Sequence, residues 1–187
     1  EALFQAGVLA AAIKRPLVKG KPLIGLPNPA YHVYYGAALM GEADPIPVPA
    51  ADASTNYLPD YPSLPADVLD RMAIAYLCTP SNPTGGVADT QTLVRNLESA
   101  RRHGYILALD ECYSEIFNGD TPPAGAFDAV KALGETGDGA LDNLLVFNSL
   151  SKRSSAPGLR CGFVAGQADL IEKLVMIRGY GGAQVPE

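Results

Sequence analysis

The sequence predicts an α/β protein with a mostly parallel mixed sheet that has helices on both faces. Four short segments are apolar throughout, without the alternation of a half-exposed strand: residues 73–78, 105–109, 143–147 and 161–166. Helical segments separate most of them, an arrangement typical of parallel strands buried between two layers of helices. Polar residues follow three of these strands, at the edge where open α/β sheets bind their ligands.

The first third of the chain adds two helices and two extended segments. Residues 1–14 are rich in alanine and predict a helix, and residues 31–40 predict a second helix packed on its small residues. Residues 22–26 and 45–49 are expected to be extended. The stretch 50–65 is rich in Pro, Asp, Ser and Asn, which indicates a surface loop.

The remaining elements fix the direction of the last strand. Further helices are expected at residues 67–71, 89–102 and 168–178, and a loop rich in Pro and Gly at residues 118–125. Residues 152–161 leave no room for a crossover helix. The last strand is therefore expected to run antiparallel to the strand before it, or to lie away from it.

Composition excludes several classes of protein. The 187 residues are 48% hydrophobic and 18% charged, which is a globular composition and sufficient for one core. A net charge of -6 without a Lys/Arg run argues against a nucleic-acid or anionic-membrane partner. No stretch approaches the roughly 18 apolar residues that cross a bilayer.

The cysteines suggest a cytoplasmic protein, and the ends of the chain suggest a segment of a longer one. Cys78, Cys112 and Cys161 are odd in number and widely spaced, so free thiols in a reducing cytosol are expected and a metal site is not. The chain starts at Glu1 rather than methionine, and its last residues do not resemble a domain end. We expect both ends to be cuts inside a longer protein.

A lysine follows the third apolar strand, at an unusual place for a solvated charge. Desolvation lowers the pKa of a lysine and makes Lys152 a nucleophile suited to Schiff-base chemistry, whereas the plain alternative is a lysine in a surface loop. Arg160, with Ser149 and Ser151 near the lysine, forms a natural phosphate clamp. The alternative for Arg160 is a pair with a surface carboxylate.

Three further side chains follow the neighbouring strands. Asp110 ends an apolar strand, and a buried carboxylate needs a cationic partner such as a protonated ring nitrogen. A turn-capping role is its alternative. The phenol of Tyr113 is suited to donate to a ring oxygen, or else only packs. Asn82 lies in a turn, where asparagine is usually structural.

Together these residues resemble the signatures of one family. Ser-Asn-Pro-Thr-Gly at 81–85, Asp-Glu-Cys-Tyr at 110–113, Ser-Leu-Ser-Lys at 149–152 and Arg-Cys-Gly at 160–162 occur in this order. They resemble class I/II aminotransferases, which are pyridoxal-phosphate enzymes of type I fold. The resemblance implies the large domain of the aspartate-aminotransferase-like fold. Cys161 departs from the pattern, which usually has an aliphatic residue or alanine there.

The resemblance implies catalytic and ring-binding roles. Lys152 would carry pyridoxal 5'-phosphate and move a proton between the substrate and the cofactor. Asp110 would pair with the pyridinium nitrogen and so maintain the ring as an electron sink. Asn82 and Tyr113 would bind the 3-oxygen of the ring. Glu111 is expected to point away from the site and to be structural.

Other roles concern the phosphate and the faces of the ring. Ser149 and Arg160 would hold the phosphate, with Ser151 as a weaker candidate. Tyr31 matches the aromatic residue that stacks on one face of the ring. Cys112 matches the small residue that packs on the other face.

Some segments resemble one group within the family more closely. Residues 110–116, 149–154, 158–166 and 179–183 look like the proteobacterial type of succinyldiaminopimelate aminotransferase. That implies lysine biosynthesis, with N-succinyldiaminopimelate and 2-oxoglutarate as amino acid and 2-oxo acid substrates. It also implies a homodimer with the active site near the interface.

Two elements of the family are expected to lie outside residues 1–187. One is a glycine-containing phosphate loop before Glu1, and the other is a substrate-binding arginine in a small domain beyond Glu187. The chain is therefore expected to be a pyridoxal-phosphate-binding large domain, incomplete at both ends and without the small domain.

Three other functions stay open at this stage. A cysteine-conjugate β-lyase of the same fold would use the same cofactor residues. An aminotransferase-like domain of a ligand-sensing regulator would also contain them. A cofactor-free α/β binding domain is the third alternative, but it gives no reason for Asp110, Lys152 and Arg160 to converge.

Overall fold

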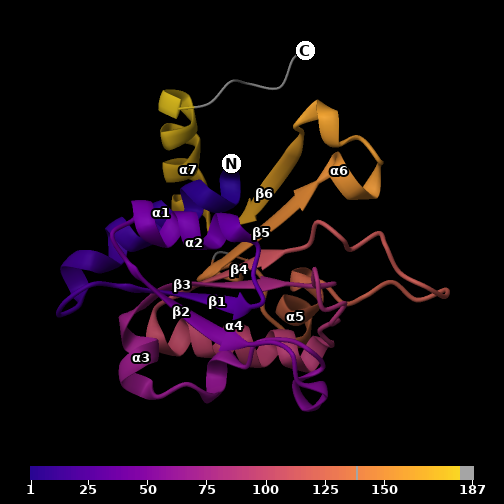
Figure 1. The fold of residues 1–187 in the computed structure, drawn as a ribbon, viewed down its shortest axis with the longest axis horizontal. Helices are drawn as coiled ribbons and strands as arrows, with labels where there is room; N and C mark the ends of the chain where they lie inside the picture. Colours follow the sequence, from indigo (N-terminus) through magenta and orange to yellow (C-terminus); the bar gives the residue numbers. More distant parts are fainter. Residues whose placement is uncertain (138, 182–187) are drawn as a thin grey trace.

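A computed structural model describes residues 1–137 and 139–181, which form a six-stranded sheet with helices on both faces (Figure 1). The strands, in the spatial order β2-β1-β3-β4-β5-β6, are β1 (Leu23–Asn28), β2 (Asp44–Pro49), β3 (Met72–Cys78), β4 (Ile106–Asp110), β5 (Leu144–Ser149) and β6 (Gly162–Gly166). The helices are α1 (Ala2–Lys14), α2 (His32–Met40), α3 (Ala66–Arg71), α4 (Thr90–His103), α5 (Ala126–Ala132), α6 (Leu150–Arg153) and α7 (Ala168–Gly181). This architecture confirms the predicted fold class.

The direction of the last strand also agrees with the sequence. Neighbouring strands from β2 to β5 are parallel, whereas β6 pairs with β5 in the antiparallel direction. Ser149 at the end of β5 lies opposite Gly162 at the start of β6. The two strands therefore form a hairpin whose connection contains only α6 and a short 3-10 turn (Pro157–Leu159).

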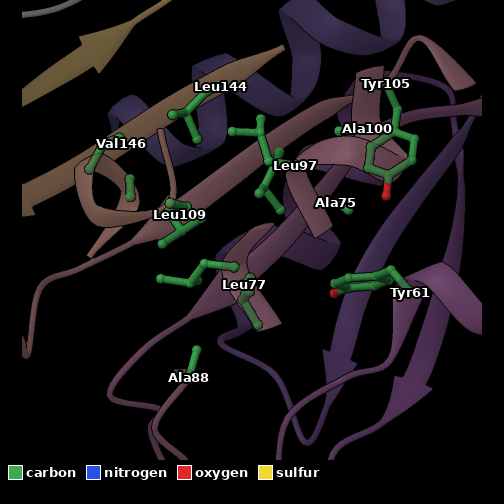
Figure 2. Close-up of a cluster of buried hydrophobic side chains, with 14 of the residues drawn as sticks. Tyr61, Ala75, Leu77, Ala88, Leu97, Ala100, Tyr105, Leu109, Leu144 and Val146 are labelled. Atoms are coloured by element: carbon green, nitrogen blue, oxygen red, sulfur yellow. The ribbon is translucent and has the colours of Figure 1, made fainter. Parts of the chain in front are cut away.

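Two hydrophobic cores explain why the central strands are apolar throughout. All seven residues of β3 are buried, and successive side chains point to opposite faces of the sheet. Ala75 and Leu77 join a core with Leu97 of α4, as Figure 2 shows. Ile74 and Tyr76 join the other core, which contains residues of α1, α2 and α7. A strand covered on both faces therefore consists mainly of apolar side chains.

Local sequence accounts for the limits of α4. Asp89 precedes the helix, and its carboxylate accepts a hydrogen bond of 2.7 Å from the Thr92 N–H. Gly104 follows the helix with a φ of +65°, a left-handed conformation that ends many helices and that glycine adopts without strain.

Two short helices were not predicted from the sequence. The Ala126 N–H at the start of α5 donates to the Glu111 side chain at 2.7 Å, across 15 residues of sequence. Glu111 therefore has the structural role expected of it. The other helix, α6, contains Lys152, and the Ser149 hydroxyl caps it by accepting from the Ser151 N–H. The predicted loop 50–65 contains two 3-10 turns. In the run 179–183, residues 182 and 183 lie outside the described residues.

We expect the Leu77→Ala substitution to destabilise the protein strongly. Leu77 is 0% exposed, and truncation of such a side chain typically costs about 2–5 kcal/mol because it leaves a cavity. The control is Leu39→Ala, since Leu39 is 77% exposed on α2 and its loss should cost less than about 0.5 kcal/mol. Urea unfolding measures both, and equal losses would contradict the assignment of the core.

Candidate active site

The segments that follow β3, β4 and β5 bring the predicted residues Asn82, Tyr113 and Lys152 together. The Asn82 side-chain amide donates to the Tyr113 hydroxyl at 3.0 Å. The Lys152 Nζ atom lies 5.9 Å from the centroid of the Tyr113 ring. Because the three strands are parallel, their carboxyl ends meet at one edge of the sheet, as the sequence predicted.

Asp110 lies at the same edge and is almost fully enclosed. Its carboxylate is buried, with 5% of the residue exposed. Its Oδ2 accepts from the Tyr34 hydroxyl at 2.7 Å, and its Oδ1 accepts from the Cys112 N–H at 3.2 Å. Within residues 1–137 and 139–181, no basic side chain forms an ion pair with it. A buried carboxylate without a cationic partner among the described residues fits a cationic group of a ligand.

The β5–β6 hairpin gathers the predicted phosphate-binding residues. The Ser149 hydroxyl donates to the Ser151 hydroxyl at 2.9 Å and accepts from the Ser151 N–H at 3.1 Å. Arg160 lies two residues before β6, and its guanidinium donates to the Pro157 carbonyl at 2.9 Å. No carboxylate pairs with Arg160 in the described part of the chain. Two hydroxyls and a guanidinium without a counter-charge fit a phosphate.

The expectation of a desolvated lysine is wrong for this part of the protein. Lys152 is exposed, and so are Arg160 and the first residues of β6. Figure 1 shows the reason: α6 lies at the end of the β5–β6 hairpin, which extends away from the layers of helices. Burial of Lys152 would need a covering element in addition to those described. The sequence could not reveal this, because an apolar strand before a lysine does not show what lies above it.

Tyr31 and Cys112, the two residues predicted to contact the ring faces, have different surroundings. Tyr31 precedes α2, is 48% exposed, and makes an edge contact with Tyr34 at 5.7 Å between ring centroids. Cys112 is partly buried, and burial raises the pKa of its thiol, with the charge of Asp110 as the second cause. The thiol is therefore neutral, as a side chain that packs against a ring should be.

Tyr34 and a cavity beside Asn82 and Tyr113 could not be predicted from the sequence. Tyr34 is one of many tyrosines in the sequence, and only the fold places its hydroxyl on Asp110. The cavity has a volume of about 570 Å³, and Asn82, Tyr113 and Phe117 are among its lining residues. It depends on the loop after Tyr113, which local sequence does not specify.

Together, these side chains fit pyridoxal phosphate. They offer a buried carboxylate for the ring nitrogen, hydrogen-bonding groups on Asn82 and Tyr113 for the ring oxygen, and phosphate donors in one hairpin. Residues 6–180 match the family described as aminotransferase class I and II. The chain belongs to this family. The match confirms the resemblance that the sequence motifs indicated.

Individual relatives extend this comparison. The LL-diaminopimelate aminotransferase of Desulforudis audaxviator is 35% identical over 150 residues, which cover 80% of this chain and 36% of that protein. A probable aminotransferase of Mycobacterium tuberculosis is 35% identical over 168 residues, which cover 89% of this chain and 35% of that protein. The chain thus spans a little over a third of the length of these curated relatives.

Solved structures confirm the aminotransferase fold. An aminotransferase from Neisseria meningitidis superposes with a TM-score of 0.86 at 36% identity, covering 98% of this chain and 44% of that one. A probable N-succinyldiaminopimelate aminotransferase from Thermus thermophilus superposes with a TM-score of 0.74 at 27% identity, covering 96% and 43%. Within residues 1–137 and 139–181, no helix is both long enough and apolar enough to span a bilayer.

We expect the stability of this region to depend on pH through Glu111. Burial is the main cause that raises the pKa of its carboxyl above the ordinary value of 4.5. The folded state therefore binds a proton more tightly than the unfolded state. The free energy of unfolding falls as pH rises from 4.5 through the raised pKa.

Glu111→Gln tests this, because the amide keeps an acceptor for the Ala126 N–H and does not titrate. Relative to wild type, the variant should become more stable as the pH is raised above 4.5. Urea unfolding over a series of pH values measures the difference, and Glu98→Gln on the exposed face of α4 is the control. A difference that does not vary with pH would contradict the prediction.

Proposed function

We propose that the full-length protein is a pyridoxal-phosphate-dependent aminotransferase that moves an amino group between an amino acid and a 2-oxo acid. The observation that carries this proposal is the location of Asp110 and Lys152 at the same edge of the sheet. Asp110 is a buried carboxylate without a cation in the described residues, and Lys152 is a free amine beside Tyr113. Membership of the aminotransferase family supports the same reaction.

The chain's own residues divide the chemistry among them. Bound pyridoxal phosphate supplies an electron sink for the carbon that bears the substrate amino group. Asp110 holds the proton on the ring nitrogen by its negative charge. Lys152 anchors the cofactor and transfers the proton between substrate and cofactor. Asn82 and Tyr113 orient the ring through its oxygen.

The remaining residues hold the cofactor in place. Ser149 and Arg160 bind the phosphate, with help from Ser151. Tyr31 and Cys112 contact the two faces of the ring. The three free cysteines support a reducing, cytoplasmic location. We also propose that residues 1–187 form the cofactor-binding large domain and that the enzyme is a homodimer with its active site near the interface, as the family resemblance implies.

Within this class we propose N-succinyldiaminopimelate and 2-oxoglutarate as the substrates, in lysine biosynthesis. Motifs 110–116 and 158–166 support this choice, as does the likeness to the Thermus thermophilus protein, whose name specifies N-succinyldiaminopimelate. Relatives named LL-diaminopimelate aminotransferase favour a related substrate without the succinyl group. Both substrates carry the same reacting amino acid centre.

The test is an assay of the purified full-length protein with each amino donor and 2-oxoglutarate. Formation of glutamate from N-succinyldiaminopimelate, at a higher kcat/KM than from LL-diaminopimelate, is the expected result. Preference for the free diamino acid would correct the substrate but keep the reaction. Release of pyruvate and a thiol from a cysteine conjugate, without glutamate formation, would show a β-lyase instead. If the full-length protein binds the cofactor but turns over none of these substrates, the regulator alternative is favoured.

A further inference from the structure

Tyr34 is bonded directly to the carboxylate on which the proposed cofactor site depends. Its side chain is 1% exposed in the core between α1, α2 and the sheet, and its hydroxyl donates to Asp110 Oδ2 at 2.7 Å. The other oxygen, Oδ1, accepts a longer bond of 3.2 Å from the Cys112 N–H. Tyr34 is therefore the nearer of the two donors to the buried charge.

The position of the Tyr34 hydroxyl is fixed by a chain of contacts that leads to α1. Its ring stacks on Tyr76 of β3, with 4.2 Å between centroids and 7° between planes. The Tyr76 hydroxyl donates to the Leu3 carbonyl at 2.7 Å. Gly7 leaves space for this hydroxyl, because a Cβ at that position would lie 2.2 Å from it. The phenol thus has little freedom to turn away from Asp110.

The hydroxyl also stays protonated under ordinary conditions. Burial raises the pKa of Tyr34 well above 10, and the charge of Asp110 raises it further. The group is a permanent neutral donor to Asp110. Its hydrogen bond fixes Oδ2 of the buried carboxylate, and loss of this donor would leave that oxygen free to turn within the core.

We propose that Tyr34 is a positioning residue that holds the Asp110 carboxylate oriented toward the ring nitrogen of pyridoxal phosphate. This rests on the proposed function, because it assumes that the cofactor binds with its nitrogen at Asp110. Tyr34 itself touches neither the substrate nor the reacting atoms in this assignment. Its effect should therefore depend on whether the bound ring contains a nitrogen.

The test uses the full-length protein and two ligands: pyridoxal phosphate and its analogue with a carbon in place of the ring nitrogen. Tyr34→Phe should weaken binding of pyridoxal phosphate about tenfold, since hydrogen bonds to charged groups contribute on this scale. Binding of the analogue should change less than about twofold, since it has no charge to match Asp110. Equilibrium binding, followed by absorbance, gives both dissociation constants.

Tyr61→Phe is a matched control. Tyr61 is also fully buried, and its hydroxyl donates to a carbonyl, that of Tyr76, at 2.6 Å, without contact to Asp110. The Tyr61→Phe variant should lose about as much free energy of unfolding as Tyr34→Phe in urea, while its two dissociation constants stay as in wild type. This separates a general loss of packing from an effect on Asp110.

Several results would overturn the proposal. If Tyr34→Phe weakened the binding of both ligands equally, Tyr34 would have a structural role only. The same conclusion would follow if Tyr61→Phe weakened pyridoxal phosphate binding as much as Tyr34→Phe does. An unchanged affinity for pyridoxal phosphate would show that the Cys112 N–H suffices for Asp110. If wild type bound both ligands equally, Asp110 would not face the ring nitrogen. If wild type bound neither, the proposed function itself would fail, and the inference with it.

Discussion

Replacement of Lys152 with alanine in the full-length protein is expected to reduce turnover by about 10³-fold or more, since general acid–base catalysis alone contributes about 10²–10⁴-fold. Lys152 is the amine beside Tyr113, at the sheet edge where Asn82 and Asp110 also lie. No other described lysine contacts these residues. Its loss removes both the anchor of the cofactor and the group that moves the proton.

Two measurements check the assignment of Lys152. Wild type should be yellow with cofactor, and borohydride followed by peptide mapping should label Lys152. The variant should bind the cofactor without any covalent label. Lys131→Ala, at an exposed position of α5, is the control and should keep wild-type turnover and labelling. A Lys152→Ala variant with full turnover, or a label on another lysine, would refute the role.

The second large effect is expected from Asp110→Asn. Removal of one member of a buried charge pair costs about 3–5 kcal/mol, so affinity for the cofactor should fall by about 10²-fold or more, and turnover with it. The cofactor-free protein should behave differently. Its buried carboxylate has no cation in the described residues, and the amide retains an acceptor oxygen. Its free energy of unfolding should therefore change by less than about 1.5 kcal/mol.

Titration with pyridoxal phosphate and urea unfolding without it give the two quantities. Asp120→Asn, in the exposed loop after β4, is the matched control and should alter neither. A large loss of stability in the cofactor-free Asp110→Asn protein, with unchanged affinity, would show that the carboxylate is structural. It would also remove the main argument for a pyridinium partner.

The fold was largely predictable because its signals are local. Strands such as β3 and β4 are buried on both faces, which requires continuous apolar runs. The limits of α4 follow from Asp89 and Gly104, which act within one helical turn. The short connection before β6 excluded a parallel crossover. By contrast, α5 depends on the Glu111 carboxylate, whose separation of 15 residues leaves no periodic pattern.

The sequence by itself determined the chemical groups of the candidate site and the strand ends that carry them. Asn82, Asp110 and Lys152 follow apolar strands, and the parallel sheet brings such ends to one edge. The tertiary structure alone decided how each group is held. It bonds Tyr34 to Asp110 and leaves Lys152 exposed on its hairpin. The physical reason is range: strand burial is set by neighbouring residues, whereas the partner and the solvent exposure of a side chain depend on packing between distant segments.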